Sequence, residues 1–92
     1  MQETHICSFV IYINPKYFTS VIANIDRLNA IECGALDSTA AKAIVIAEAE
    51  SMGAMDDHIQ RLNSLTGVLS VNMVFHQVES LEGLDQELIV CN

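Results

Sequence analysis

A short segment of this sequence occurs twice in similar form, and the repeat limits the folds that the chain can adopt. Residues 25–31 read Ile-Asp-Arg-Leu-Asn-Ala-Ile, and residues 59–65 read Ile-Gln-Arg-Leu-Asn-Ser-Leu. Each copy is followed within a few residues by a glycine that opens a short apolar run, at Gly34 and at Gly67. A helix end, a turn and the start of a strand are therefore predicted at two places in the chain.

Alternating apolar side chains predict the strands around these two copies. Residues 6–13, 42–50 and 67–79 alternate along their length, which is typical of strands with two different faces. Residues 35–38 predict a short strand with a weaker signal, and residues 39–41 predict the hairpin turn that follows it. The sequence thus predicts four strands.

Two helices are predicted between the strands. Asn14 is a suitable N-cap and Pro15 suits the first helical position, so a helix is expected from Pro15 to about Asn29. Ser51 is a suitable cap for a second helix, which continues through the second copy of the repeat to about Leu65. Apolar residues recur at spacings of three and four in both segments, so each helix has one face to bury.

The order of these elements is βαββαβ, and right-handed crossovers place both helices on one face of the sheet. We therefore expect an α+β protein with the ferredoxin-like fold, in which a four-stranded antiparallel sheet carries two helices on one face. A single domain is expected over residues 1–79. Residues 80–92 are expected to form a tail, either as a short helix or as a disordered end.

Composition excludes several classes of function. The chain has 92 residues and a formal net charge of −8, which disfavours contact with the phosphates of nucleic acids. No apolar run approaches the roughly 18 residues of a membrane span, and no secretory signal opens the sequence. We expect a cytoplasmic protein in which Cys7, Cys33 and Cys91 are reduced thiols.

The face of the sheet without helices is the candidate site. We chose the strand register that buries Phe9, Val45 and Phe75, and a slip of one residue would exchange the two faces. Glu50 follows Glu48 on the same face by alternation. The other residues expected outward form an apolar strip with a polar edge: Ser8, Val10, Tyr12, Ile44, Ile46, Glu48, Ser70, Asn72, Val74 and His76.

An exposed apolar strip of this kind marks an interface. Three occupants are considered from the residues alone: the tail of the same chain, a second copy in a weak homodimer, or a separate peptide. Such a peptide would be apolar or amphipathic with positive charge at one end, because the edge of the strip is acidic.

The sequence lacks the usual patterns of catalytic and metal-binding sites. His5, His58 and His76 lack the spacing of a metal site, and His5 and His76 would meet only if adjacent strands aligned them. No nucleophile elbow, glycine-rich phosphate loop or paired-carboxylate site is present. A small phosphatase of this fold would need an arginine to hold phosphate, and Arg27 and Arg61 fall in the helices. We expect no enzyme activity, no metal and no cofactor.

Four segments carry a resemblance to a known family. Residues 6–8, 44–50, 67–71 and 74–79 resemble the NapD family, the assembly chaperones of periplasmic nitrate reductase, with matching spacing over residues 6–79. The pair His76-Gln77, which closes the last strand after Gly-Val-Leu-Ser-Val, is the most specific part of this match.

The resemblance implies a cytoplasmic protein that binds the twin-arginine signal peptide of the catalytic subunit, NapA. Such a chaperone would delay export until the molybdenum cofactor is in place. The family is described as receiving its peptide as a helix on the sheet.

Residue roles follow from the resemblance only at matching positions. Ser8, Glu48 and His76 match, and Val10, Ile46 and Val74 lie beside them. We expect the valines and Ile46 to contact the apolar side of the peptide, and Glu48 or Glu50 to meet an arginine. The full predicted peptide-binding set is Ser8, Val10, Tyr12, Ile44, Ile46, Glu48, Glu50, Asn72, Val74 and His76. The alternative is a ferredoxin-like regulatory or dimerisation module that binds a small ligand.

Overall fold

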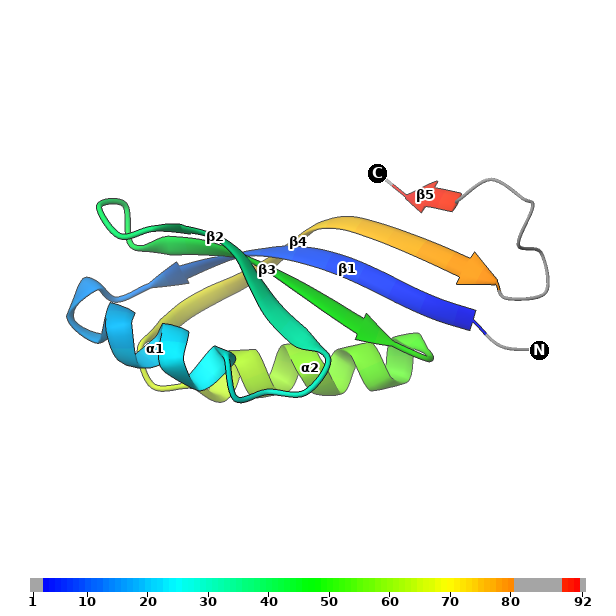
Figure 1. Cartoon of the computed structure of the whole chain (residues 1–92). Helices are drawn as coiled ribbons and strands as arrows, with labels where there is room; N and C mark the ends of the chain where they lie inside the picture. Colours follow the sequence, from blue (N-terminus) through cyan, green and yellow to red (C-terminus); the bar gives the residue numbers. More distant parts are fainter. Residues whose placement is uncertain (1–2, 81–88, 92) are drawn as a thin grey trace.

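The computed structural model describes residues 3–80 and 89–91 and contains one antiparallel sheet with two helices on one face (Figure 1). The sheet order is β2-β3-β1-β4-β5, so β1 lies at the centre. The four predicted strands, both helices and the ferredoxin-like arrangement are confirmed. The elements are β1 (Glu3–Ile13), the 3₁₀ turn η1 (Pro15–Tyr17), α1 (Phe18–Ile25), β2 (Ile31–Asp37), β3 (Lys42–Ala49), α2 (Met52–Ser64), β4 (Val68–Ser80) and β5 (Ile89–Cys91).

The predicted tail falls mostly outside the described residues. Its described part, Ile89–Cys91, is the short strand β5, which pairs with residues 76–78 of β4. These three residues form a strand, whereas a short helix or a disordered end was expected.

The first helix begins as predicted but is shorter. The Asn14 side chain accepts a hydrogen bond from the Lys16 backbone N–H, and Pro15 opens a 3₁₀ turn before α1. The helix ends at Ile25 instead of continuing to about Asn29. Residues 26–30 form the turn into β2, and Ala30 adopts a left-handed backbone with φ of 65°. Residues 26–29, which were predicted to be helical, therefore belong to this turn. The strand β2 starts at Ile31, four residues before its predicted start.

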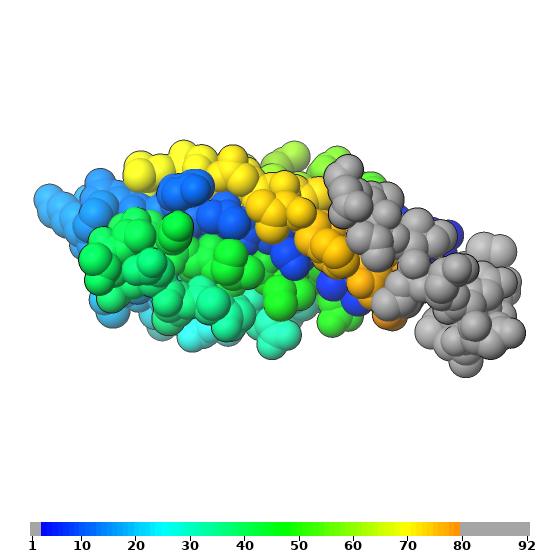
Figure 2. All heavy atoms as spheres, turned by 90° about the horizontal axis from the view of Figure 1, so that it is seen from above, coloured from blue at the N-terminus to red at the C-terminus, as the bar shows by residue number. Residues whose placement is uncertain are grey.

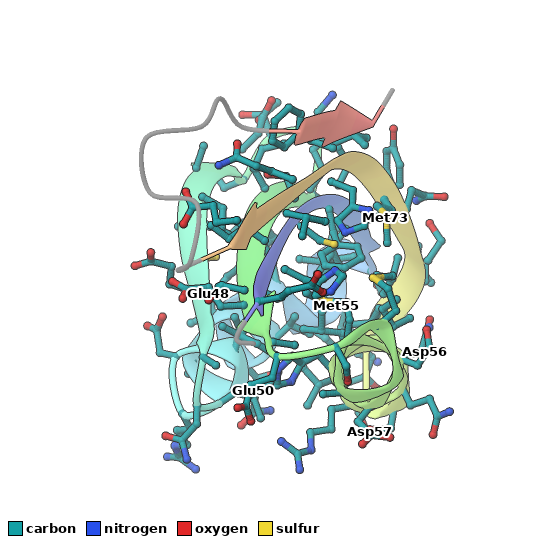
Figure 3. The ribbon with its side chains drawn as sticks, turned by 90° about the vertical axis from the view of Figure 1, so that its right-hand side faces the viewer. Glu48, Glu50, Met55, Asp56, Asp57 and Met73 are labelled. Atoms are coloured by element: carbon teal, nitrogen blue, oxygen red, sulfur yellow. The ribbon has the colours of Figure 1, made fainter. Side chains whose placement is uncertain are left out.

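The second helix follows its prediction closely. The Ser51 hydroxyl accepts a hydrogen bond from the Ala54 N–H at 3.1 Å and caps α2. Met55 points from α2 toward the sheet, whereas Asp56 and Asp57 point away from it (Figure 3). A left-handed Gly67 then turns the chain into β4, where a side chain would collide with Tyr17.

The core lies between the helices and the sheet. Every second residue of β1 from Cys7 to Ile13 is buried, and the same alternation buries Ala43, Val45 and Ala47 of β3. Val21 and Ile25 of α1 and Met55 and Leu62 of α2 close this layer from the other side. The predicted assignment of the two faces of β1 and β3 is confirmed.

The last long strand departs from the predicted register at two points. Its pairing with β1 shifts between Ser8 and Phe9 and again between Tyr12 and Ile13, which leaves Val74 and Leu69 as the extra residues of β-bulges. Each bulge exchanges the faces of the residues beyond it. Only residues 70–73 keep the predicted register.

Two residues of β4 therefore face the opposite way from the prediction. Phe75 lies opposite Ser8 and belongs to the face without helices, whereas His76 lies opposite the buried Cys7 and belongs to the helix-covered face. Val68 lies opposite Ile13 and also packs against the core. The expectation that Phe75 is buried in the core and that His76 points outward is wrong, because a regular alternation was carried through the bulge at Val74.

Candidate functional site

The helix-free face of the sheet is built from cross-strand rows that run from β2 to β4. One row contains Ala35, Ile44, Val10 and Asn72, and the next contains Glu32, Ile46, Ser8 and Phe75. Two further rows close the ends: Asp37, Lys42, Tyr12 and Ser70 at one, and Glu48, Ile6 and Gln77 at the other.

The centre of this face is apolar and only partly exposed. Val10, Ile44, Ile46 and Phe75 are half-buried, and together we call them the apolar strip. In the view onto this face, β2, β3, β1 and the first half of β4 lie side by side at the surface (Figure 2). Both helices lie on the opposite side of the sheet (Figure 1). Within the described residues, no helix covers the strip.

Two hollows adjoin the strip at opposite ends. A largely apolar hollow of about 200 Å³ is lined by Val10, Tyr12, Ala35, Leu36, Asp37, Lys42, Ala43 and Ile44. A second hollow of about 270 Å³ is lined by Ala30, Ile31, Glu32, Ile46 and Glu48. The first can receive an apolar side chain, and the second presents carboxylates beside an isoleucine.

Two hydrogen bonds fix the backbone of Glu48. Its N–H donates to the carbonyl of Ala30 at 2.9 Å, and its carbonyl accepts from the ring of His58 on α2 at 3.0 Å. Its side chain is exposed, and within residues 3–80 it is not in salt-bridge distance of a lysine or arginine. The carboxylate is thus available to a cationic partner.

The other predicted site residues divide into two groups. Ser8, Tyr12 and Asn72 lie on the helix-free face as predicted, and the Asn72 amide donates to the Val10 carbonyl at 3.3 Å. Val74 is 57% exposed but lies in a bulge at the side of the strip. Glu50 is exposed on the bend after β3, which ends at Ala49.

His76 is brought together with His5 on the helix-covered side. The His5 Nδ1 and His76 Nε2 atoms are 3.0 Å apart, and the ring centroids are 5.3 Å apart with nearly parallel planes. The centroid distance equals the nitrogen separation plus two ring radii, so the rings meet edge to edge in a hydrogen bond. The two strands do align these histidines. Within the described residues, no group of three or more His, Cys, Asp or Glu side chains is arranged to hold a metal.

The described thiols have environments that disfavour ionisation. Burial raises the pKa of Cys7, and burial together with the negative charge of Asp26 raises the pKa of Cys33. A thiol with a raised pKa is a poor nucleophile at neutral pH. Both side chains belong to the packed layer beneath the sheet.

Sequence reasoning missed three residues of the helix-free face. Phe75 was assigned to the core because the bulge at Val74 has no sequence signal. Glu32 and Ala35 line the two hollows, but β2 was expected to begin only at Ala35. The alternation of Ile31 and Cys33 on the helix side with Glu32 on the other was the signal that could have extended this strand.

Comparisons with known proteins agree with this architecture. Residues 4–80 match the family described as NapD protein. The chain belongs to the NapD family. The match to this family spans β1 to β4 and so includes all the strands that carry the strip and its hollows.

Individual NapD relatives are distant but cover most of the chain. The proteins named Chaperone NapD from Escherichia coli (strain K12) and from Shigella flexneri are each 26% identical over 74 residues, which is 80% of this chain and 85% of theirs. The solution structure of the E. coli Tat proofreading chaperone protein NapD covers 91% of this chain and 87% of its own, with a TM-score of 0.74 and 23% identity. The shared fold is shown by this structure. In the described part of the chain no helix is long and apolar enough to span a membrane.

Proposed function

We propose that this NapD-family protein is a cytoplasmic, non-catalytic chaperone that binds the twin-arginine signal peptide of the nitrate reductase catalytic subunit, NapA. By occupying the peptide it delays export until the cofactor is inserted and the subunit is folded. The observation that supports this most directly is the apolar strip on the helix-free face, with exposed carboxylates at one end. A twin-arginine signal peptide has the matching chemistry, because a cationic segment precedes an apolar one.

The strip is large enough for binding of moderate strength. Covering an apolar side chain contributes at most ~1.5–3 kcal/mol, and the four residues of the strip are already partly buried. The ordering of the peptide and the loss of its translational freedom oppose this gain. A dissociation constant on the order of micromolar is therefore expected.

Isothermal titration of the protein with the NapA signal peptide tests the proposal. We expect saturable binding that weakens as salt is added, because the arginines contact an acidic surface. A scrambled peptide of the same composition is the control. Equal binding of the native and scrambled peptides would contradict the proposal.

Substitutions on the sheet test whether the peptide binds to the apolar strip. Val10→Glu and Ile46→Glu introduce a charge at the centre of the strip and should abolish measurable binding while the fold is retained. Leu69→Glu is the matched control, because Leu69 is 66% exposed and lines neither hollow. Unchanged affinity in the first two variants would move the site elsewhere.

Light scattering separates this proposal from the alternative of a dimerisation module. We expect a monomer at micromolar concentration, since the strip must be free to receive the peptide. A tight dimer that is destabilised by Ile46→Glu would show that a second copy covers the strip.

A further inference from the structure

The helix-free face has different charges at its two ends, and this asymmetry bears on how a peptide lies there. At one end, Glu32 of β2 and Glu48 of β3 flank Ile46 and both line the same hollow. At the other end, Asp37 lies opposite Lys42, so one acidic and one basic side chain offset each other. Between the two ends, the residues of β3 and β1 on this face are uncharged.

We infer that the bound signal peptide has one fixed direction, with its cationic amino-terminal segment over Glu32 and Glu48 and its apolar segment over Val10, Ala35 and Ile44. This inference rests on the proposed function and adds to it the polarity of the complex. It also assigns to Glu32 the role of a second counter-ion for the arginine pair, beside Glu48.

The dimensions of the face suit a helical peptide in this direction. Glu48 and Lys42 are six residues apart along β3, which corresponds to about 20 Å of strand. A helix covers that distance with about 13 residues, whereas an extended chain needs only about six. The apolar region of a signal peptide has about 7–15 residues, so a helix carries its whole length across the apolar part of the face.

The helix dipole favours the same direction. The amino terminus of a helix carries a partial positive charge, and the carboxyl terminus carries a partial negative charge. In the inferred direction, the positive end and the arginines both approach Glu32 and Glu48. In the reverse direction, the negative end would approach these carboxylates and the arginines would meet Lys42. Peptide charge and helix dipole therefore act together.

The acidic hollow provides both parts of an arginine site. The methylenes of an arginine can pack on Ile46, which lines the hollow between the two glutamates, while the guanidinium reaches a carboxylate. The Ala30 and His58 hydrogen bonds fix the Glu48 backbone, so its carboxylate is presented from a rigid strand end.

Paramagnetic relaxation enhancement tests the direction. A nitroxide is attached either to the amino terminus or to the carboxyl terminus of the NapA signal peptide, and amide signals of the intact protein are recorded. The amino-terminal label should broaden the amides of Glu32 and Glu48, and the carboxyl-terminal label those of Tyr12 and Lys42. The opposite pattern, or equal broadening at both ends, would overturn the inference while leaving the proposed function intact. Absence of any peptide-dependent broadening would instead count against the proposed function.

Charge variants test the role of Glu32. Glu32→Gln and Glu48→Gln should each weaken peptide binding roughly three- to tenfold, and the effect should disappear with a peptide whose two arginines are replaced by glutamine. Asp56→Asn and Asp57→Asn are the matched controls, because they change net charge equally but point away from the sheet on α2. If Glu32→Gln binds the native peptide as the controls do, or loses affinity equally for the arginine-free peptide, the assignment of Glu32 is wrong.

Discussion

The two faces of the sheet are made from the same strands, yet they have opposite physical characters. On one face, Phe9 and Val45 are completely packed beneath the helices. On the other, Val10 and Ile44 are their direct neighbours in sequence and are only half-buried. The difference does not lie in hydrophobicity, because both faces carry aliphatic side chains. It lies in coverage, since both crossovers place their helices on the same side.

This comparison separates stability from recognition in a chain of only 92 residues. A chain of this size has one hydrophobic core, and here that core needs only the helix-covered face. The apolar residues on the helix-free face therefore contribute less to the free energy of unfolding than those of the core. Substitutions on the helix-covered face should mainly lower the free energy of unfolding, whereas substitutions on the helix-free face should mainly weaken peptide binding.

The largest difference is expected for two adjacent residues of β1. Phe9→Ala removes a side chain that is 1% exposed and should lower the free energy of unfolding by about 3–5 kcal/mol. Val10→Ala should lower it by less than about 1 kcal/mol and should weaken peptide binding instead. Urea unfolding and peptide titration of both variants provide the measurements. Similar losses of stability at the two positions would contradict the division between the faces.

How far the sequence predicts this division depends on the regularity of each strand. In β1 and β3, strict alternation placed Phe9, Val10, Val45 and Ile46 on their correct faces, because neither strand has a bulge in their mutual pairing. In β4 the same reasoning failed beyond Val74. A bulge is a property of two paired strands, and the sequence of one strand does not record where its partner slips.

The edge strand shows a different limit. β2 was predicted over residues 35–38 but spans Ile31–Asp37, and its first four residues were assigned to the connection that follows the first helix. Residues 26–29 continue the helical spacing, so local pattern alone favoured a longer helix. The chain leaves the helix instead, because Ala30 adopts a left-handed backbone and the residues from Ile31 onward pair with β3. As a consequence, Glu32 was not predicted to be a site residue.

The corrected register of β4 makes a prediction for Phe75. Its side chain is half-buried on the helix-free face, so Phe75→Ala should cost about 1–2 kcal/mol of stability, well below the cost of Phe9→Ala. Peptide affinity should fall at the same time, because the aromatic ring extends the apolar strip. A stability loss as large as that of Phe9→Ala, with peptide affinity unchanged, would restore Phe75 to the core.

A smaller effect is expected at the adjacent position. His76→Ala removes the hydrogen bond to His5 and should lower the free energy of unfolding by about 0.5–1.5 kcal/mol. Peptide affinity should remain at the wild-type value, because His76 faces the helix-covered side. Gln77→Ala is the comparison variant on the helix-free face, where the Gln77 amide donates to Glu79 at 3.2 Å. A loss of affinity in His76→Ala relative to the wild type would show that this histidine acts in recognition.

The smallest effect concerns two thiols on the helix-covered face. Burial raises the pKa of Cys7 and of Cys33 above the usual value of 9.0, so the folded protein retains protons that the unfolded chain loses. The stabilisation is complete below the pKa of the unfolded thiol and is lost as the pH rises toward the folded value. Ionisation of the two thiols in the unfolded chain should lower the free energy of unfolding by less than about 1 kcal/mol between pH 8 and pH 9. In the double variant Cys7→Ala/Cys33→Ala, the loss over this pH interval should become smaller by the same amount, whatever the cost of the substitutions at neutral pH. Peptide affinity should be unaffected by these two thiols, since neither lies on the helix-free face. An unchanged pH dependence of unfolding in the double variant would show that other groups cause the alkaline loss.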